Sequence, residues 1–238
     1  MRLYIKCCLF VLCSEKNENI RKNDLKKLRL LLYDGGLPAV EYTGGNIKKQ
    51  IRERIAELTG STEFHLEQVY TLESCGGADI LYLGAANIES VRSLGDGCRL
   101  ADFIVQRNKN ICFDGCEYPY TTETKVSNGN VEYSHRIEAE DEAVRELLLR
   151  ALICYKRIRA SIEYTDIMFK FMASSFTIED VRSVYNLITE SDADRSNFRK
   201  KVFKYCKETD APDKEKTGYR PSRRYVFEPD NDIDNIWV

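Results

Sequence analysis

The sequence has 238 residues, of which 43% are hydrophobic and 31% are charged. This length fits one large domain or two domains of ordinary size, and this composition excludes a chain that is disordered throughout. The formal net charge of −2 indicates no class of partner by itself, so the distribution of charge along the chain is more informative.

The first strongly apolar run is LYIKCCLFVLC, residues 3–13. Lys6 interrupts this run, no small-residue cleavage site follows it, and it is too short to span a bilayer. The pattern therefore differs from that of a signal peptide or a membrane helix. We expect a buried strand here, in a soluble cytoplasmic protein.

The following segments combine short apolar runs with one helical pattern. The stretch NIKKQIRERIAELTG, residues 46–60, repeats its aliphatic side chains at helical spacing, and Gly60 stands where a helix usually ends. We predict further strands at residues 28–34, 65–72, 78–86, 102–107 and 131–138. Together these elements predict an α+β domain over residues 1–140.

A second helical period predicts a long helix over about residues 139–161, which we assign as a linker, residues 141–163. Thr177 and Asp180 then have the spacing of a capping box at the start of another helix. After a short turn comes a second helix, which is basic, and a stretch rich in turn residues then predicts a hairpin. This order of elements predicts a winged helix-turn-helix domain over residues 164–229 and an acidic tail, residues 230–238.

The segment from Asp194 to Arg224 holds eleven Lys or Arg and five acids, so its net charge is +6 and the rest of the chain carries −8. A solvated helix face is one interpretation of such a run. The helix over residues 195–208 contains no acid before its last position at Glu208, whereas a solvated helix usually intersperses acids for internal pairing. We therefore favour contact with DNA. The candidate DNA-contacting residues are Arg195, Ser196, Asn197, Arg199, Lys200, Lys204, Arg220, Arg223 and Arg224.

Nine cysteines occur without a C-x-x-C pair, and there are only two histidines. This spacing disfavours a zinc site, and free thiols that act as small core residues fit a reducing cytoplasm better. We expect neither a metal nor another cofactor.

The helix at residues 46–60 resembles the catalytic helix of Nudix hydrolases, whose pattern is G-x5-E-x7-R-E-U-x-E-E-x-G-U with U a bulky aliphatic residue. In those enzymes, acids on one helical face hold the Mg²⁺ that bridges a diphosphate. With Gly60 as the anchor, Glu53 stands at the arginine, Arg54 at the first metal glutamate, Glu57 at the second and Leu58 at the third. One acid of three remains, beside a guanidinium, so the resemblance implies a Nudix-like domain without hydrolase activity.

Most of the chain resembles the Nudix-related transcriptional regulators of the NrtR type. The segment IRERIAELTGSTEFHLEQVYTL, residues 51–72, is similar to their E-x-T-G helix and L-E-Q-x-Y-T strand. DRSNFRKKV resembles their recognition helix, and GYRPSRRYVF resembles their wing, with Tyr219 inserted. The loop before the helix departs from the family pattern L-P-G-G at Ala39 and Val40.

This resemblance implies a Nudix-like α/β/α sandwich, a linker helix and a winged helix-turn-helix. It also implies a homodimer that reads a palindromic operator in double-stranded DNA, with an ADP-ribose-like or sugar effector. Two alternatives stay open. The first is a Mg²⁺-dependent hydrolase of nucleoside diphosphate derivatives that uses acids from elsewhere, such as Glu67 or Glu73, and the second is a protein-interaction module without a DNA role.

Overall fold

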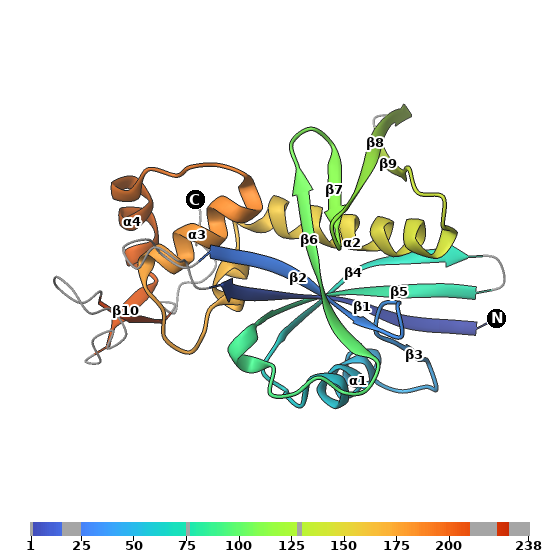
Figure 1. The fold of residues 1–238 in the computed structure, drawn as a ribbon, viewed down its shortest axis with the longest axis horizontal. Coiled ribbons are helices and arrows are strands. Elements are labelled where there is room, and N and C mark those ends of the chain that lie inside the picture. The colour runs from blue at the N-terminus through green and yellow to red at the C-terminus, as the bar shows by residue number, and fades with distance from the viewer. Residues whose placement is uncertain (1, 16–24, 75–76, 128–129, 210–222, 229–238) are drawn as a thin grey trace.

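The computed structural model describes residues 2–15, 25–74, 77–127, 130–209 and 223–228 (Figure 1). A mixed sheet in the order β4-β5-β1-β2-β6-β7-β8-β9 forms its centre, with β3 paired to β1. The strands of this sheet are β1 (Arg2–Glu15), β2 (Leu25–Tyr33), β3 (Ala39–Glu41), β4 (His65–Ser74), β5 (Gly77–Asn87), β6 (Cys98–Gln106), β7 (Asn110–Phe113), β8 (Cys116–Ser127) and β9 (Asn130–Ile137).

The predicted strand at residues 3–13 is confirmed as the middle of the sheet. β1 pairs in parallel with β5 and antiparallel with β2, so both of its edges are bonded. Its side chains alternate between two hydrophobic clusters, with Cys7 and Leu9 in one and Cys8 and Phe10 in the other. A strand that is buried on both faces needs a continuous apolar run, which explains the sequence of this segment.

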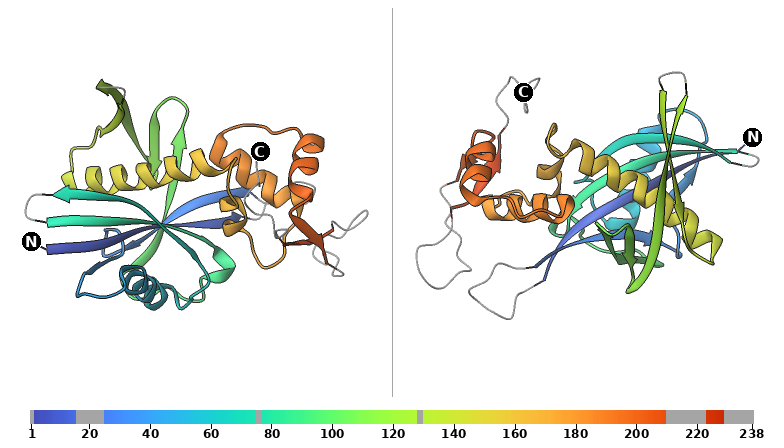
Figure 2. Two further views of the ribbon diagram at one scale, coloured as in Figure 1. Left: turned by 180° about the vertical axis from the view of Figure 1, so that it is seen from behind. Right: turned by 90° about the horizontal axis from the view of Figure 1, so that it is seen from above.

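Two helices cover the two faces of the sheet (Figures 1 and 2). α1 (Ile47–Thr59) packs Ile51 and Ile55 on one face, and α2 (Glu142–Ser161) packs Leu148 and Ala151 on the other. The α/β/α sandwich expected from the sequence is therefore confirmed. α2 was expected to act as a linker, and the structure shows that it is also one layer of this sandwich.

Hairpins on the β6 side of the sheet were largely missed. The sequence pattern predicts no strand over residues 110–127, which hold β7 and most of β8. β8 pairs antiparallel with β9, from Tyr120 opposite Ile137 to Ser127 opposite Asn130. The dipeptide Asn128-Gly129 between them is a strong hairpin signal that could have located both strands.

The C-terminal elements occupy one end of the molecule (Figure 2). They are the 3-10 helix η2 (Ile167–Phe171), α3 (Ile178–Thr189), α4 (Arg195–Phe203), β10 (Cys206–Glu208) and β11 (Tyr225–Phe227). Another short 3-10 helix, η1 (Ile88–Ser90), follows β5 in the first part of the chain. β10 and β11 pair antiparallel, as expected for a wing. The hydrophobic cluster on the α2 face continues into α3 and α4, so these elements share one core with the sheet.

The predicted capping box at the start of α3 is confirmed. The Thr177 hydroxyl accepts from the backbone N–H of Asp180 at 3.1 Å, and the Asp180 carboxylate accepts from the backbone N–H of Thr177 at 2.9 Å. Lys26 of β2 also lies 3.0 Å from the Asp180 carboxylate. This cap therefore joins the first helix of the C-terminal domain to the sheet.

Replacing Thr177 with alanine is expected to lower the free energy of unfolding by about 1 kcal/mol, because the N–H of Asp180 loses its side-chain acceptor and keeps only the Thr177 carbonyl. Chemical denaturation followed by circular dichroism measures this. Thr177→Ser, which keeps the hydroxyl, is the control and should lose much less. Equal losses in the two variants would show that the methyl group, not the cap, is what matters.

Candidate nucleic-acid interface

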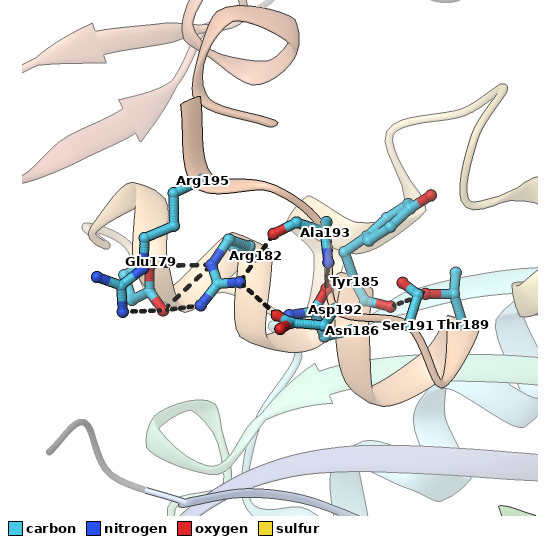
Figure 3. Close-up of polar contacts among 9 residues, drawn as sticks. All are labelled: Glu179, Arg182, Tyr185, Asn186, Thr189, Ser191, Asp192, Ala193 and Arg195. Atoms are coloured by element: carbon cyan, nitrogen blue, oxygen red, sulfur yellow. Dashed lines mark hydrogen bonds and ion pairs between the residues drawn. The ribbon is translucent and has the colours of Figure 1, made fainter. Parts of the chain in front are cut away.

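The turn between α3 and α4 is held by Arg182 (Figure 3). Its guanidinium donates to the carboxylate of Glu179 at 2.7 Å, to the carboxylate of Asp192 at 3.0 Å and to the backbone carbonyl of Ala193 at 2.9 Å. The Asn186 side chain accepts from the N–H of Ala193 at 2.9 Å. These bonds join α3 to Asp192 and Ala193, the two residues before the Asp194 cap of α4, and so fix where α4 begins.

The inward side of α4 agrees with the sequence pattern. Phe198 and Val202 are buried, and Tyr205 is buried just beyond the helix. The Phe198 ring lies 5.3 Å from the ring of Tyr185 on α3. Asp194 caps the helix by accepting from the N–H of Asn197 at 2.9 Å. The rotation of α4 about its axis is therefore set by its apolar stripe.

The outward side of α4 carries the candidate residues that the structure describes on this helix. The exposed ones are Arg195, Ser196, Asn197, Arg199, Lys200 and Lys204. Arg195 lies 3.7 Å from Glu179, and the Arg199 guanidinium lies 5.7 Å from the Phe203 ring. Within the described ranges, no carboxylate forms an ion pair with Arg199, Lys200 or Lys204. Most of the positive charge on this face is therefore available to an external anion.

The predicted basic helix is shorter than expected. It was assigned to residues 195–208, but α4 ends at Phe203 and Lys204 is its C-terminal cap. The chain leaves the helix because Cys206–Glu208 pairs with Tyr225–Phe227 as the wing. Lys207 consequently lies in β10, and its ammonium is 3.0 Å from the Glu228 carboxylate.

The three arginines expected on the wing have different surroundings. Arg223 donates to the Glu208 carboxylate at 2.8 Å. Arg224 donates to the side chain of Ser175 at 3.0 Å and to its carbonyl at 2.7 Å, so it anchors the wing to the segment before α3. Arg220 lies outside the described residues. A DNA contact by any of the three stays a prediction.

The side chains at the metal positions of the Nudix-like helix, α1, have other contacts in the structure. Arg54 donates to the Glu57 carboxylate at 3.2 Å, and its guanidinium lies 4.5 Å from the Tyr33 ring. Leu58 is buried, and Glu53 is exposed with its carboxylate 3.7 Å from Lys49. Gly60 has φ +63°, which confirms the expected left-handed helix end. The Arg54 guanidinium therefore occupies the position of the first metal-binding carboxylate.

One set of contacts between the sheet and the winged helix had no signal in the sequence. The Glu190 carboxylate, at the end of α3, accepts from Arg159 of α2 at 2.9 Å, and its backbone carbonyl accepts from Arg107. The buried hydroxyl of Tyr155 donates to the carbonyl of Ile188 at 2.8 Å. These partners are far apart in sequence, and only the packing of α2 and of the end of β6 next to α3 brings them together.

Residues 168–227 match the family model described as the NrtR DNA-binding winged helix domain. This part of the chain is an NrtR-like winged helix domain. The crystal structure of Shewanella oneidensis NrtR complexed with a 27mer DNA is similar over 96% of this chain and 94% of that one, with a TM-score of 0.66 and 13% identity. Another crystal structure of Shewanella oneidensis NrtR gives a TM-score of 0.62 at 14% identity, over 97% of this chain and 95% of that one.

A MutT/nudix family protein from Enterococcus faecalis is also similar, with a TM-score of 0.61 and 18% identity over 95% of this chain and 88% of that one. No curated protein matches the sequence. At these identities the solved structures establish only the fold of this chain, a Nudix-like domain followed by a winged helix. Within the described part of this chain, every helix is too short or too polar to cross a lipid bilayer.

Proposed function

We propose that this NrtR-like chain is a transcriptional regulator that binds double-stranded DNA through α4 and the wing. The observation that carries the proposal is that Asn197, Arg199 and Lys200 are all exposed on a helix that buries Phe198 and Val202. In winged and other helix-turn-helix domains the second helix lies in the major groove, and its N-terminal residues contact base edges. Asparagine and arginine suit adenine and guanine edges, while lysine and serine suit phosphates.

We further propose a homodimer that reads a palindromic operator. One copy of α4 covers only a few base pairs, because its nine residues span about 14 Å at 1.5 Å per residue. Two copies related by a two-fold axis would address half-sites about one helical turn apart. The Nudix-like domain is the proposed dimerisation and sensor domain, with a nucleotide-sugar or sugar effector. The division into residues 1–140, 141–163 and 164–229 stays a prediction.

Fluorescence anisotropy with labelled duplexes from the region upstream of the chain's own operon tests DNA binding. We expect saturable binding that competitor DNA of random sequence displaces poorly, and light scattering should give twice the mass of one chain. Failure to bind any neighbouring promoter, at low salt and with or without candidate metabolites, would contradict the proposal.

We also propose that the Nudix-like domain does not hydrolyse diphosphates. Arg54 at the metal position would repel Mg²⁺, and Glu57 is already paired with it. Glu67, an alternative acid, accepts from Arg157 at 2.7 Å and so has its own partner. The side chain of Glu73 lies outside the described residues.

A phosphate-release assay with ADP-ribose or a dinucleotide and Mg²⁺ tests this absence of activity. We expect no turnover above that of Glu57→Gln. Mg²⁺-dependent release that Glu57→Gln abolishes would establish the hydrolase instead.

A further inference from the structure

A groove of about 410 Å³ lies between α1, the start of β4 and the segment that leads from η2 to α3. Its polar walls come from both parts of the chain. Lys48 and Arg52 of α1 contribute to it with His65, while Lys170 and Ser174 contribute from the segment that enters the winged helix. A molecule bound here would contact the Nudix-like domain and the approach to the winged helix at once.

This groove is separate from the degenerate metal position. Arg52 and Arg54 are two residues apart on α1, so their side chains leave the helix in nearly opposite directions. Arg54 lies over the Tyr33 ring, whereas Arg52 lies 5.0 Å from the Phe64 ring and donates to the carbonyl of Thr62 at 3.2 Å. The groove is therefore on the side of α1 that faces away from the Nudix-like metal position.

The groove carries excess positive charge. Within the described ranges, neither Lys48 nor Arg52 forms an ion pair with a carboxylate, while Lys170 lies 2.6 Å from the Asp166 carboxylate. Glu63 also lines the groove, but its carboxylate lies 3.6 Å from Arg92 outside.

The surroundings of His65 agree with a positive groove. Burial lowers the pKa of His65 below its usual value, and the Lys170 ammonium lowers it further, with a smaller effect of the same sign from Lys48. The Asp166 and Glu67 carboxylates act in the opposite direction. Because the imidazole stays neutral at pH 7, it offers a hydrogen bond in addition to the charges of the lysines and Arg52.

We propose that this groove binds the phosphate group of a small phosphorylated metabolite. A site for a neutral sugar would need no converging ammonium and guanidinium groups, whereas lysine and arginine are the usual partners of phosphate. The volume is within the range of small-molecule sites. The inference rests on the proposed function, since the bound molecule would be the effector of the regulator.

The contacts next to the groove connect it to the wing. Ser174 precedes Ser175, which accepts from Arg224, and the N–H of Phe176 donates to the carbonyl of Tyr225 at 2.9 Å. The Lys170 ammonium lies 5.7 Å from the ring of Phe227 on β11. A phosphate that draws Lys170 toward the groove would act directly on the segment that positions the wing.

Isothermal titration calorimetry on the full chain without DNA tests the site, with ribose 5-phosphate, inorganic pyrophosphate and ribose as probes. We expect ribose 5-phosphate to bind and ribose not to bind. Lys48→Gln should weaken ribose 5-phosphate by about tenfold, because one charge-assisted contact is lost. The matched control is Lys49→Gln, which removes the same charge one residue further along α1, where the ammonium lies 3.7 Å from Glu53. Its dissociation constant should stay within about twofold of the wild type.

Lys170→Gln is a second variant for the same titration, with thermal unfolding to verify that it folds. Absence of ribose 5-phosphate binding at millimolar concentration, binding of pyrophosphate alone, or equal losses in Lys48→Gln and Lys49→Gln would each overturn the inference. Anisotropy on DNA without ligand is a separate readout, in which Lys48→Gln should match the wild type. Wild-type failure in that assay would contradict the proposed function, while the calorimetry would still decide the phosphate site.

Discussion

Replacing Asn197 or Arg199 with alanine is expected to weaken binding to the cognate operator by about 1–3 kcal/mol, roughly 5- to 150-fold. Both side chains are exposed on α4, and the buried Phe198 and Val202 prevent the helix from rotating them inward. Because these side chains are expected to read base edges, each variant should lose preference for the operator over random DNA. Anisotropy titrations with both duplexes at one salt concentration measure the two effects.

Lys204→Ala is the matched comparison. Lys204 caps the end of α4 and is expected to contact phosphate, so its loss should weaken all sequences alike and reduce the salt dependence by about one counterion. Equal losses on cognate and random DNA for Asn197→Ala, Arg199→Ala and Lys204→Ala would contradict this division of roles. Such a result would mean that α4 contacts DNA only through electrostatic attraction to the phosphates.

Asp79→Ala is expected to cost about 3–5 kcal/mol of the free energy of unfolding, as the loss of one partner of a buried ion pair usually does. The Asp79 carboxylate accepts from Arg150 of α2 at 2.6 Å and from Lys6 of β1 at 2.8 Å. The Asp79 side chain is 4% exposed and that of Arg150 is 10% exposed. The Nε atom of Arg150 has no hydrogen-bond partner among the described residues, so without Asp79 the guanidinium would keep only the exposed Glu146 carboxylate, at 2.9 Å, as a charged partner.

The double variant Asp79→Ala with Arg150→Met separates the buried charge from the lost packing. An apolar side chain of similar length removes the buried guanidinium that has lost its buried carboxylate partner, so the double variant should be more stable than Asp79→Ala alone. Urea denaturation of the three proteins measures this. A double variant that is no more stable than Asp79→Ala would show that the cost comes from the cavity.

The same carboxylate predicts an acid-sensitive contribution to stability. Burial alone would raise the pKa of Asp79, but hydrogen bonds and charge from Lys6 and Arg150 lower it below its ordinary value of about 3.8. A carboxyl group whose pKa is lower in the folded state stabilises the protein above its ordinary pKa. That contribution is lost as the pH falls through the lower folded value. Asp79→Ala should therefore lose less stability than the wild type between pH 7 and strongly acidic pH.

The sequence located much of the candidate interface because its signals are local. The capping box at Thr177, the cap at Asp194 and the inward side chains of α4 depend on residues within one or two helical turns. The predicted end of α4 is wrong because Cys206–Glu208 pairs as a strand with β11, which begins after 16 intervening residues. The role of Arg224 as an anchor was missed for the same reason, since its partner Ser175 is 49 residues away.

Residue identity alone determined that the helix over residues 47–59 lacks the acids of a Nudix metal site, and that positive charge gathers after Asp194. Only the tertiary structure decided which of the described charges there pair with a carboxylate, as Arg195, Lys207 and Arg223 do. The strand order and the packing of α2 bring Arg107 and Arg159 to Glu190, and Arg150 to Asp79. Helix caps and apolar stripes follow from backbone geometry over a few residues, whereas ion pairs across 31 to 83 residues form only after the sheet and its covering helices have assembled.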